Sequence, residues 1–157
     1  NSSGYDKVET LKLLDGVFDI YMPDFKFWAP DVAKRLCKAA DYPQIARDAL
    51  REMHRQVGDL EINAQGIAVR GVLIRHLVLP NGLGGTRDIM RFLKTEISTN
   101  SYVNIMAQYR PCGQAMDDPD IALSLRDEEY KEALDIAAEE GISRLDDRRR
   151  AFMINWF

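Results

Sequence analysis

The sequence predicts a single α/β domain built on a parallel sheet. Three short runs rich in apolar residues, each suited to one strand, alternate with segments in which apolar residues recur at helical spacing. Helices between successive strands are typical of βαβ units, whose strands run parallel and whose crossovers are right-handed. The chain has 157 residues, 46% of them hydrophobic, which is enough for one packed domain.

The first third of the chain contains one predicted strand and three predicted helical segments. In order, they are a helical face over 8–14, a strand over 17–22, a helix over 30–40 and a helix over 43–57. Pro23 ends the strand, and Pro30 suits the first turn of the next helix. An apolar stripe over 43–57 is formed by Ala46, Leu50, Met53 and Val57, and Gly58 is expected to end that helix.

The rest of the chain contains two further strands and two further helices. The expected elements are a small inserted hairpin over 60–70, a strand over 72–79, a helix carrying Ile89, Leu93 and Ile97, a strand over 102–106, and a helix capped by Ser124 or Asp127. The hairpin is predicted from two short alternating runs around a turn. The basic and apolar tail over 148–157 is expected to be solvated.

Composition and charge exclude several classes of function. With 21 basic and 25 acidic residues the net charge is −4, which disfavours broad binding to nucleic acid. No apolar run is long enough to span a membrane, and the N-terminus does not resemble a signal peptide. Two cysteines, Cys37 and Cys112, make no disulfide framework and fit a reducing, cytoplasmic setting. Two histidines exclude a His-rich metal site.

Polar residues cluster where the three predicted strands end. They are Asp24, Lys26, Arg75, His76, Gln108, Tyr109 and Arg110. The carboxyl ends of parallel strands meet at one edge, where α/β folds bind ligands. A basic and polar rim of this kind suits a small ligand that carries a carboxylate.

Structural interpretations of the same residues are open at this point. Asp24 and Lys26 lie two positions apart on an extended segment, and they suit an ion pair that holds a loop. Arg75, in the middle of a strand, needs a partner, which is either a ligand or one of Asp24 and Asp19. His76 must point the other way, and a hydrogen-bonded histidine beneath a helix is favoured over a catalytic base.

A glycine-rich turn over 82–86 precedes the fourth predicted helix. Backbone N–H groups at such a turn can bind an anion. The turn matches neither the Walker A pattern nor GxGxxG, and a flexible connection from strand to helix is the alternative.

Six segments of the chain resemble one known family. They are Asn1–Tyr5, Asp19–Lys26, Tyr42–Pro43, Arg51–Gly58, Arg75–Pro80 and Val103–Pro111. Together they resemble the C-terminal half of radical S-adenosylmethionine proteins related to the pyruvate formate-lyase activating enzymes. The resemblance covers nearly the whole chain up to about residue 145.

The resemblance implies that residues 1–157 form the C-terminal half of a partial (β/α) TIM-type barrel, without the cluster-binding half. Proteins of this family hold a [4Fe–4S] cluster through a CxxxCxxC loop and cleave S-adenosylmethionine reductively. The resulting 5′-deoxyadenosyl radical removes a hydrogen atom from the substrate. In the activating enzymes that substrate is a glycine of a glycyl-radical enzyme, which is the partner that the resemblance implies.

The resemblance also assigns cofactor-binding roles to six positions. One of them, Tyr109, is assigned together with its neighbour Arg110. Asp24 and Lys26 match an Asp-x-Lys motif that contacts the methionine portion, and Arg75 matches a strand arginine that reaches the cofactor. Arg110 falls where the family often has a histidine. Asn1 matches an asparagine at a strand end near the cofactor.

The chain departs from the family pattern in two ways. It has no CxxxCxxC motif, because its two cysteines lie 75 positions apart, and it lacks the GGEP-type strand that grips the cofactor's amino group. We therefore expect the parent protein to be an oxidoreductase and this chain alone to be inactive. A half barrel leaves an open sheet edge, which predicts pairing of two copies.

Two other functions are compatible with the sequence. The first is a non-catalytic half-barrel module that pairs with another chain. The second is a barrel enzyme that binds a phosphate ligand through the turn over 82–86.

Overall fold

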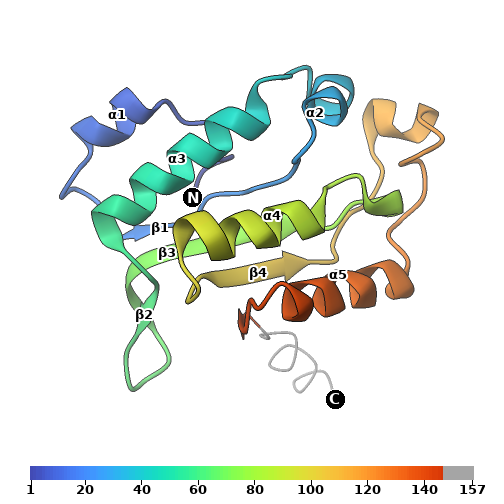
Figure 1. The fold of residues 1–157 in the computed structure, drawn as a ribbon. Helices are drawn as coiled ribbons and strands as arrows, with labels where there is room; N and C mark the ends of the chain where they lie inside the picture. The colour runs from blue at the N-terminus through green and yellow to red at the C-terminus, as the bar shows by residue number, and fades with distance from the viewer. Residues whose placement is uncertain (147–157) are drawn as a thin grey trace, which may run out of the picture.

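The structure is a computed structural model in which residues 1–146 are described. It confirms the predicted mixed α/β fold with a parallel sheet (Figure 1). The strands are β1 (Ile20–Tyr21), β2 (Glu61–Ile62), β3 (Ala68–Leu77), β4 (Tyr102–Met106) and β5 (Arg144–Leu145). β1, β3, β4 and β5 lie side by side in that order and run parallel, whereas β2 pairs antiparallel with β3. The tail predicted over 148–157 lies outside the described residues.

The helices follow the predicted pattern closely. They are α1 (Val8–Leu13), α2 (Pro30–Cys37), α3 (Tyr42–Val57), α4 (Thr86–Phe92) and α5 (Asp127–Glu139). Two short 3₁₀-helices are η1 (Pro80–Gly82) and η3 (Gly113–Asp117), and a π-helical segment, η2 (Leu93–Ile97), continues α4. Ala46, Leu50 and Met53 are buried, which confirms the apolar stripe of α3. Gly58 follows that helix with a φ of 74°, a conformation that favours glycine and ends the helix.

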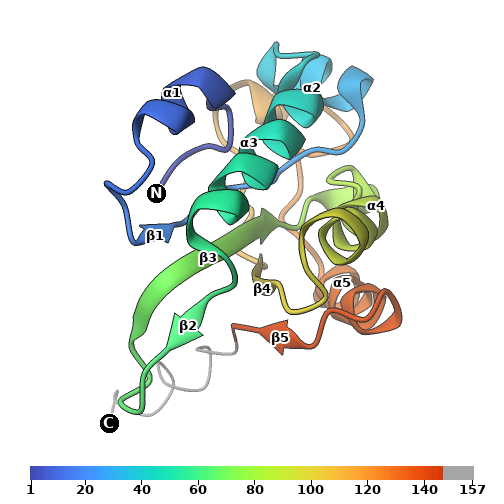
Figure 2. The ribbon, with the colours of Figure 1, turned by 60° about the vertical axis from the view of Figure 1, so that its left-hand side comes forward.

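The parallel strands are neighbours in space in the same order as in the chain. α3 lies between β1 and β3 in sequence, α4 between β3 and β4, and α5 between β4 and β5. α1 contacts α3, η2 contacts α3, and α4 contacts α5, so these helices form one layer. Figure 2 shows this layer on one side of the sheet. We call that side the helix-covered face and the other side the opposite face.

The two faces follow from the alternation of side chains along each strand. On the helix-covered face, Ile74 and His76 of β3 and Val103 and Ile105 of β4 are buried. The residues between them, such as Arg75 and those at alternate positions of β4, point to the opposite face. Among residues 1–146, no helix is long and apolar enough to cross a membrane.

The structure corrects two predicted elements in the first half of the chain. The strand expected over 17–22 pairs only at Ile20–Tyr21 as a regular element, followed by single bridges at Pro23 and Asp24. Proline has no N–H to donate to a ladder, which breaks the strand there. The hairpin is present, but its second arm is the start of β3 rather than a separate insertion.

The structure also corrects the C-terminal part of the prediction. Neither Ser124 nor Asp127 caps α5. Arg126 is the N-cap residue, and its backbone N–H donates to Glu129 Oε2 at 3.0 Å. β5 was not predicted, because two residues carry no readable alternation.

Candidate functional site

A row of polar residues crosses three parallel strands on the opposite face. Asp24, just after β1, pairs with Arg75 of β3, and Arg75 in turn is in register with Asn104 of β4. Because residues in register on neighbouring strands point the same way, all three side chains project from the opposite face. We call Asp24, Arg75 and Asn104 the polar row. It lies towards the carboxyl ends of the strands, where the sequence predicted a site.

Two cations share one carboxylate at the end of this row. Arg75 Nε donates to Asp24 Oδ1 at 2.7 Å, and Lys26 Nζ lies 2.7 Å from Asp24 Oδ2. The Asp24 side chain is 10% exposed, whereas those of Lys26 and Arg75 are 32% and 24% exposed. The three groups together carry one net positive charge, and the exposed portion of that cluster is cationic. The ion-pair interpretation of Asp24 and Lys26, and the pairing of Arg75 with Asp24, are both confirmed.

Backbone hydrogen bonds fix the segment that carries Asp24 and Lys26. Phe25 N–H donates to the Arg75 carbonyl at 2.8 Å, and Arg75 N–H donates to the Pro23 carbonyl at 2.9 Å. Lys26 N–H donates to the hydroxyl of Tyr42 at 3.1 Å. Burial raises the pKa of Tyr42, so this hydroxyl stays protonated and keeps its own donor for a carbonyl. The cluster is therefore held in place before any ligand arrives.

The other predicted site residues lie outside this contact cluster. Asn1 is exposed at the outer edge of β1, next to Ser2, whose N–H donates to the Met22 carbonyl. Tyr109 packs on the core, and its hydroxyl donates to the Ile121 carbonyl at 2.7 Å. Arg110 is exposed. Asn104, which sequence reasoning did not single out, is the residue that completes the polar row, and only the register between strands identifies it.

His76 is buried on the helix-covered face, as the structural interpretation predicted. Its Nδ1 lies 2.8 Å from the Phe25 carbonyl oxygen and its Nε2 lies 2.9 Å from Thr86 Oγ1. Burial lowers the pKa of His76 to about 4, so the ring is neutral near pH 7. The His76 side chain lies on the other face of the sheet from the polar row. His54 also has a structural partner, because its Nε2 lies 2.9 Å from Asp59 Oδ1.

The glycine-rich turn packs tightly against the chain segment after β1. A Cβ at Gly85 would lie 2.6 Å from Trp28 Cβ, and Gly85 has a φ of 73°. A Cβ at Gly84 would lie 3.2 Å from His76 Cε1. Close packing and backbone conformation therefore account for these glycines without an anion.

The described residues offer few metal ligands. Cys37 and Cys112 are free and exposed. Within residues 1–146, no group of three or more His, Cys, Asp or Glu side chains is arranged to hold a metal ion. Two cysteines in the whole chain cannot supply the thiolates of a CxxxCxxC loop, so a [4Fe–4S] cluster does not fit this chain alone.

Comparison with known proteins identifies one similar protein and no family. The chain is 36% identical over 148 residues to an uncharacterized protein of Methanocaldococcus jannaschii. The match covers 94% of this chain and 39% of that protein, so the chain spans about two fifths of the relative's length. No family model matches the chain, and no solved structure matches it.

Proposed function

We propose that this chain is the S-adenosylmethionine-binding side of a radical S-adenosylmethionine enzyme, built as the C-terminal half of a partial (β/α) barrel. The order of the parallel strands supports the barrel, because it follows the chain without a reversal. A doubly wound sheet reverses its order and carries helices on both faces, whereas a barrel keeps its helices outside. Here the helices form one layer on one face (Figure 2).

The shared carboxylate of Asp24 carries the proposal. Lys26 and Arg75 hold one more positive charge than Asp24 neutralises, and both retain hydrogen-bond donors that Asp24 does not use. A ligand carboxylate, such as that of a methionyl group, would accept those donors at the carboxyl ends of the strands. Asp24 acts as a positioning residue that keeps the two cations together and limits the conformational entropy lost on binding.

The chain contributes binding and orientation, and the cofactor contributes the chemistry. When bound beside an iron–sulfur cluster, S-adenosylmethionine supplies radical hydrogen abstraction. The cluster ligands would come from outside this chain, because its two cysteines do not suffice. Activation of a glycyl-radical enzyme is the form of this chemistry that the sequence resemblance favours.

The outer edge of β1 supports the idea of an incomplete barrel. Ser2 forms a parallel bridge with Pro23 at this edge, like the end of a further parallel strand. Phe18 is 46% exposed and Ile20 is 38% exposed. A cavity of about 140 Å³ beside them is lined mainly by apolar side chains. We propose that a further strand covers this edge, from a longer polypeptide or from a second copy of the chain.

Calorimetric titration with S-adenosylmethionine tests the assignment of Lys26 and Arg75. In the full protein, Lys26→Ala and Arg75→Ala should each weaken binding by about 1–3 kcal/mol, as expected for loss of a charged hydrogen-bond donor. Lys34→Ala is the control, because Lys34 is an exposed lysine on α2. Unchanged affinity in both site variants would overturn the proposal.

A further inference from the structure

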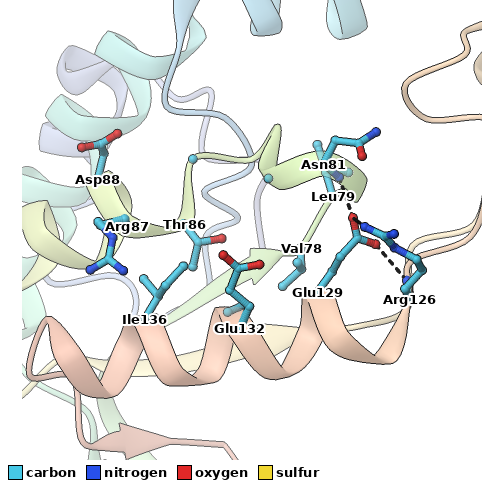
Figure 3. A pocket seen from close by; sticks show the side chains of 13 residues that line it. Val78, Leu79, Asn81, Thr86, Arg87, Asp88, Arg126, Glu129, Glu132 and Ile136 are labelled. Atoms are coloured by element: carbon cyan, nitrogen blue, oxygen red, sulfur yellow. Dashed lines mark hydrogen bonds and ion pairs between the residues drawn. The ribbon is translucent and has the colours of Figure 1, made fainter.

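A second cavity, of about 320 Å³, lies between η1, α4 and α5 on the side of the helices (Figure 3). It shares no residue with the polar row. Val78 and Leu79, which follow β3, line it together with Ala133 and Ile136 of α5. Val78, Leu79 and Ala133 are buried, so the cavity has an apolar wall. Its volume lies within the usual range for small-molecule sites.

The arginines that line this cavity already have acidic partners. Arg126 Nη2 donates to Glu129 Oε1 at 3.1 Å, and the Asn81 N–H donates to the same oxygen at 2.8 Å. Arg87 Nη2 donates to Glu139 Oε2 at 2.7 Å. These cations are therefore poorly suited to attract an anion into the cavity, because acidic side chains already neutralise them.

Glu132 is the charged group of this cavity that has no partner among residues 1–146. It is exposed on α5, and its carboxylate rises between Thr86 and Val78 (Figure 3). A carboxylate is an acceptor only, so it favours a ligand that donates hydrogen bonds and carries positive charge.

Thr86 adds a second acceptor from the other side of the cavity. The carbonyl of Phe25 can only accept, so His76 Nδ1 carries the proton of this neutral ring, and His76 Nε2 must accept. The Thr86 hydroxyl then donates its one proton to Nε2, and its oxygen lone pairs remain for the cavity. Thr86 is 7% exposed, so the direction of this hydroxyl is fixed by buried neighbours.

We propose that this cavity binds a primary alkylammonium group, with the ammonium between Glu132 and Thr86 and the alkyl stem against Val78 and Ile136. Glu132 has no partner in the described part of the chain and the Thr86 oxygen keeps its lone pairs, so both groups can accept hydrogen bonds, and an –NH₃⁺ group supplies three donors and a positive charge. The apolar wall matches a short aliphatic stem. The ligand is either a free aliphatic amine or the side chain of a lysine, which share this chemistry.

Titration of the full protein with n-butylammonium chloride, followed by two-dimensional amide NMR, tests the proposal. Saturable shifts are expected at Thr86, Glu132 and Ala133. Glu132→Gln should weaken binding by about tenfold or more, as expected for loss of a charge-assisted hydrogen bond. Glu128→Gln is the matched control, because it removes the same charge from an exposed position of α5 that does not line the cavity. Thr86→Ser keeps the hydroxyl and should keep binding.

Parallel titrations distinguish the source of the ammonium and define failure. Tighter binding of Nα-acetyl-lysine amide than of n-butylammonium would identify a lysine side chain as the ligand. Tighter binding of n-butylammonium would identify a free amine. Equal binding of uncharged n-butanol, equal losses in the Glu128 and Glu132 variants, or the absence of saturable shifts would overturn the proposal. None of these results depends on S-adenosylmethionine.

Discussion

The two faces of the parallel sheet differ sharply in chemistry although they share the same strands. On the helix-covered face, Ile74, Val103 and Ile105 are buried among helices. On the opposite face, the half-buried polar residues Arg75 and Asn104 lie between two apolar pairs of positions, Leu73 with Tyr102 and Leu77 with Met106. One set of strands can therefore build a core and a ligand site together, because alternate side chains point to opposite faces. Substitutions at the buried positions of the first face should cost stability, and those at Arg75 and Asn104 should mainly cost binding.

The largest expected effect is a loss of stability, measured by truncating two neighbouring residues of β4, Ile105 and Met106. Ile105→Ala removes a buried side chain that is 4% exposed and should lower the free energy of unfolding by about 2–5 kcal/mol. Met106→Ala, on the half-buried opposite face, should cost less than half as much. Urea denaturation of the two variants measures both values. Equal losses would mean that the two faces are packed alike.

The second prediction is that the free energy of unfolding depends on pH through His76, which is buried on the helix-covered face. The ordinary pKa of histidine is 6.5, and burial lowers the pKa of His76 to about 4. Between these values the unfolded chain binds a proton that the folded protein does not, so stability falls as the pH drops from 6.5 to about 4. The loss should be of the order of 3 kcal/mol. His76→Gln should flatten this part of the unfolding profile, and an unchanged profile would contradict a buried neutral ring.

The third effect concerns the carboxylate on the opposite face. Asp24→Asn leaves Lys26 and Arg75 together without an anion, and it should cost about 1–3 kcal/mol of stability. Asp48→Asn is the control, because Asp48 pairs with Arg51 but its side chain is 43% exposed. Thermal denaturation compares the two. A larger loss in the control would show that the Asp24 cluster is not held together as described.

The smallest expected change in stability is at Asn104. Asn104→Ala should alter the free energy of unfolding by no more than about 0.5 kcal/mol, because the side chain is half-buried and truncating it opens no core cavity. The same variant should weaken S-adenosylmethionine binding if the polar row extends the site. A large loss of stability without a change in binding would assign Asn104 to the core.

Strong periodicity made most of the fold predictable from the sequence. The apolar stripe of α3 extends over 16 residues, beyond the length at which helix and strand patterns are confused, and the run that predicted β3 is rich in aliphatic and β-branched residues and ends at Pro80. β5 could not be found, because its two residues are a strand only through pairing with β4. The N-cap Arg126 was also missed, since arginine is not a usual N-cap residue and the hydrogen bond at this end runs from its own backbone N–H to the Glu129 carboxylate.

The candidate site was predictable only in part. Asp24, Lys26 and Arg75 stand out as charged residues at strand ends, and the structure brings them together. Asn104 depends on the register between β3 and β4, which no local pattern reveals. Asn1 and Tyr109 lie outside the cluster because loop geometry, rather than strand order, decides their positions.

Binding of S-adenosylmethionine at the opposite face is tested most directly by an amide NMR map of the full protein during titration with that cofactor. Saturable shifts are expected at Asp24, Lys26 and Arg75 on the opposite face, and none at Glu132 of the second cavity. Shifts confined to the helix side, or no saturable shift at the three predicted residues, would contradict the assignment of the opposite face as the ligand site.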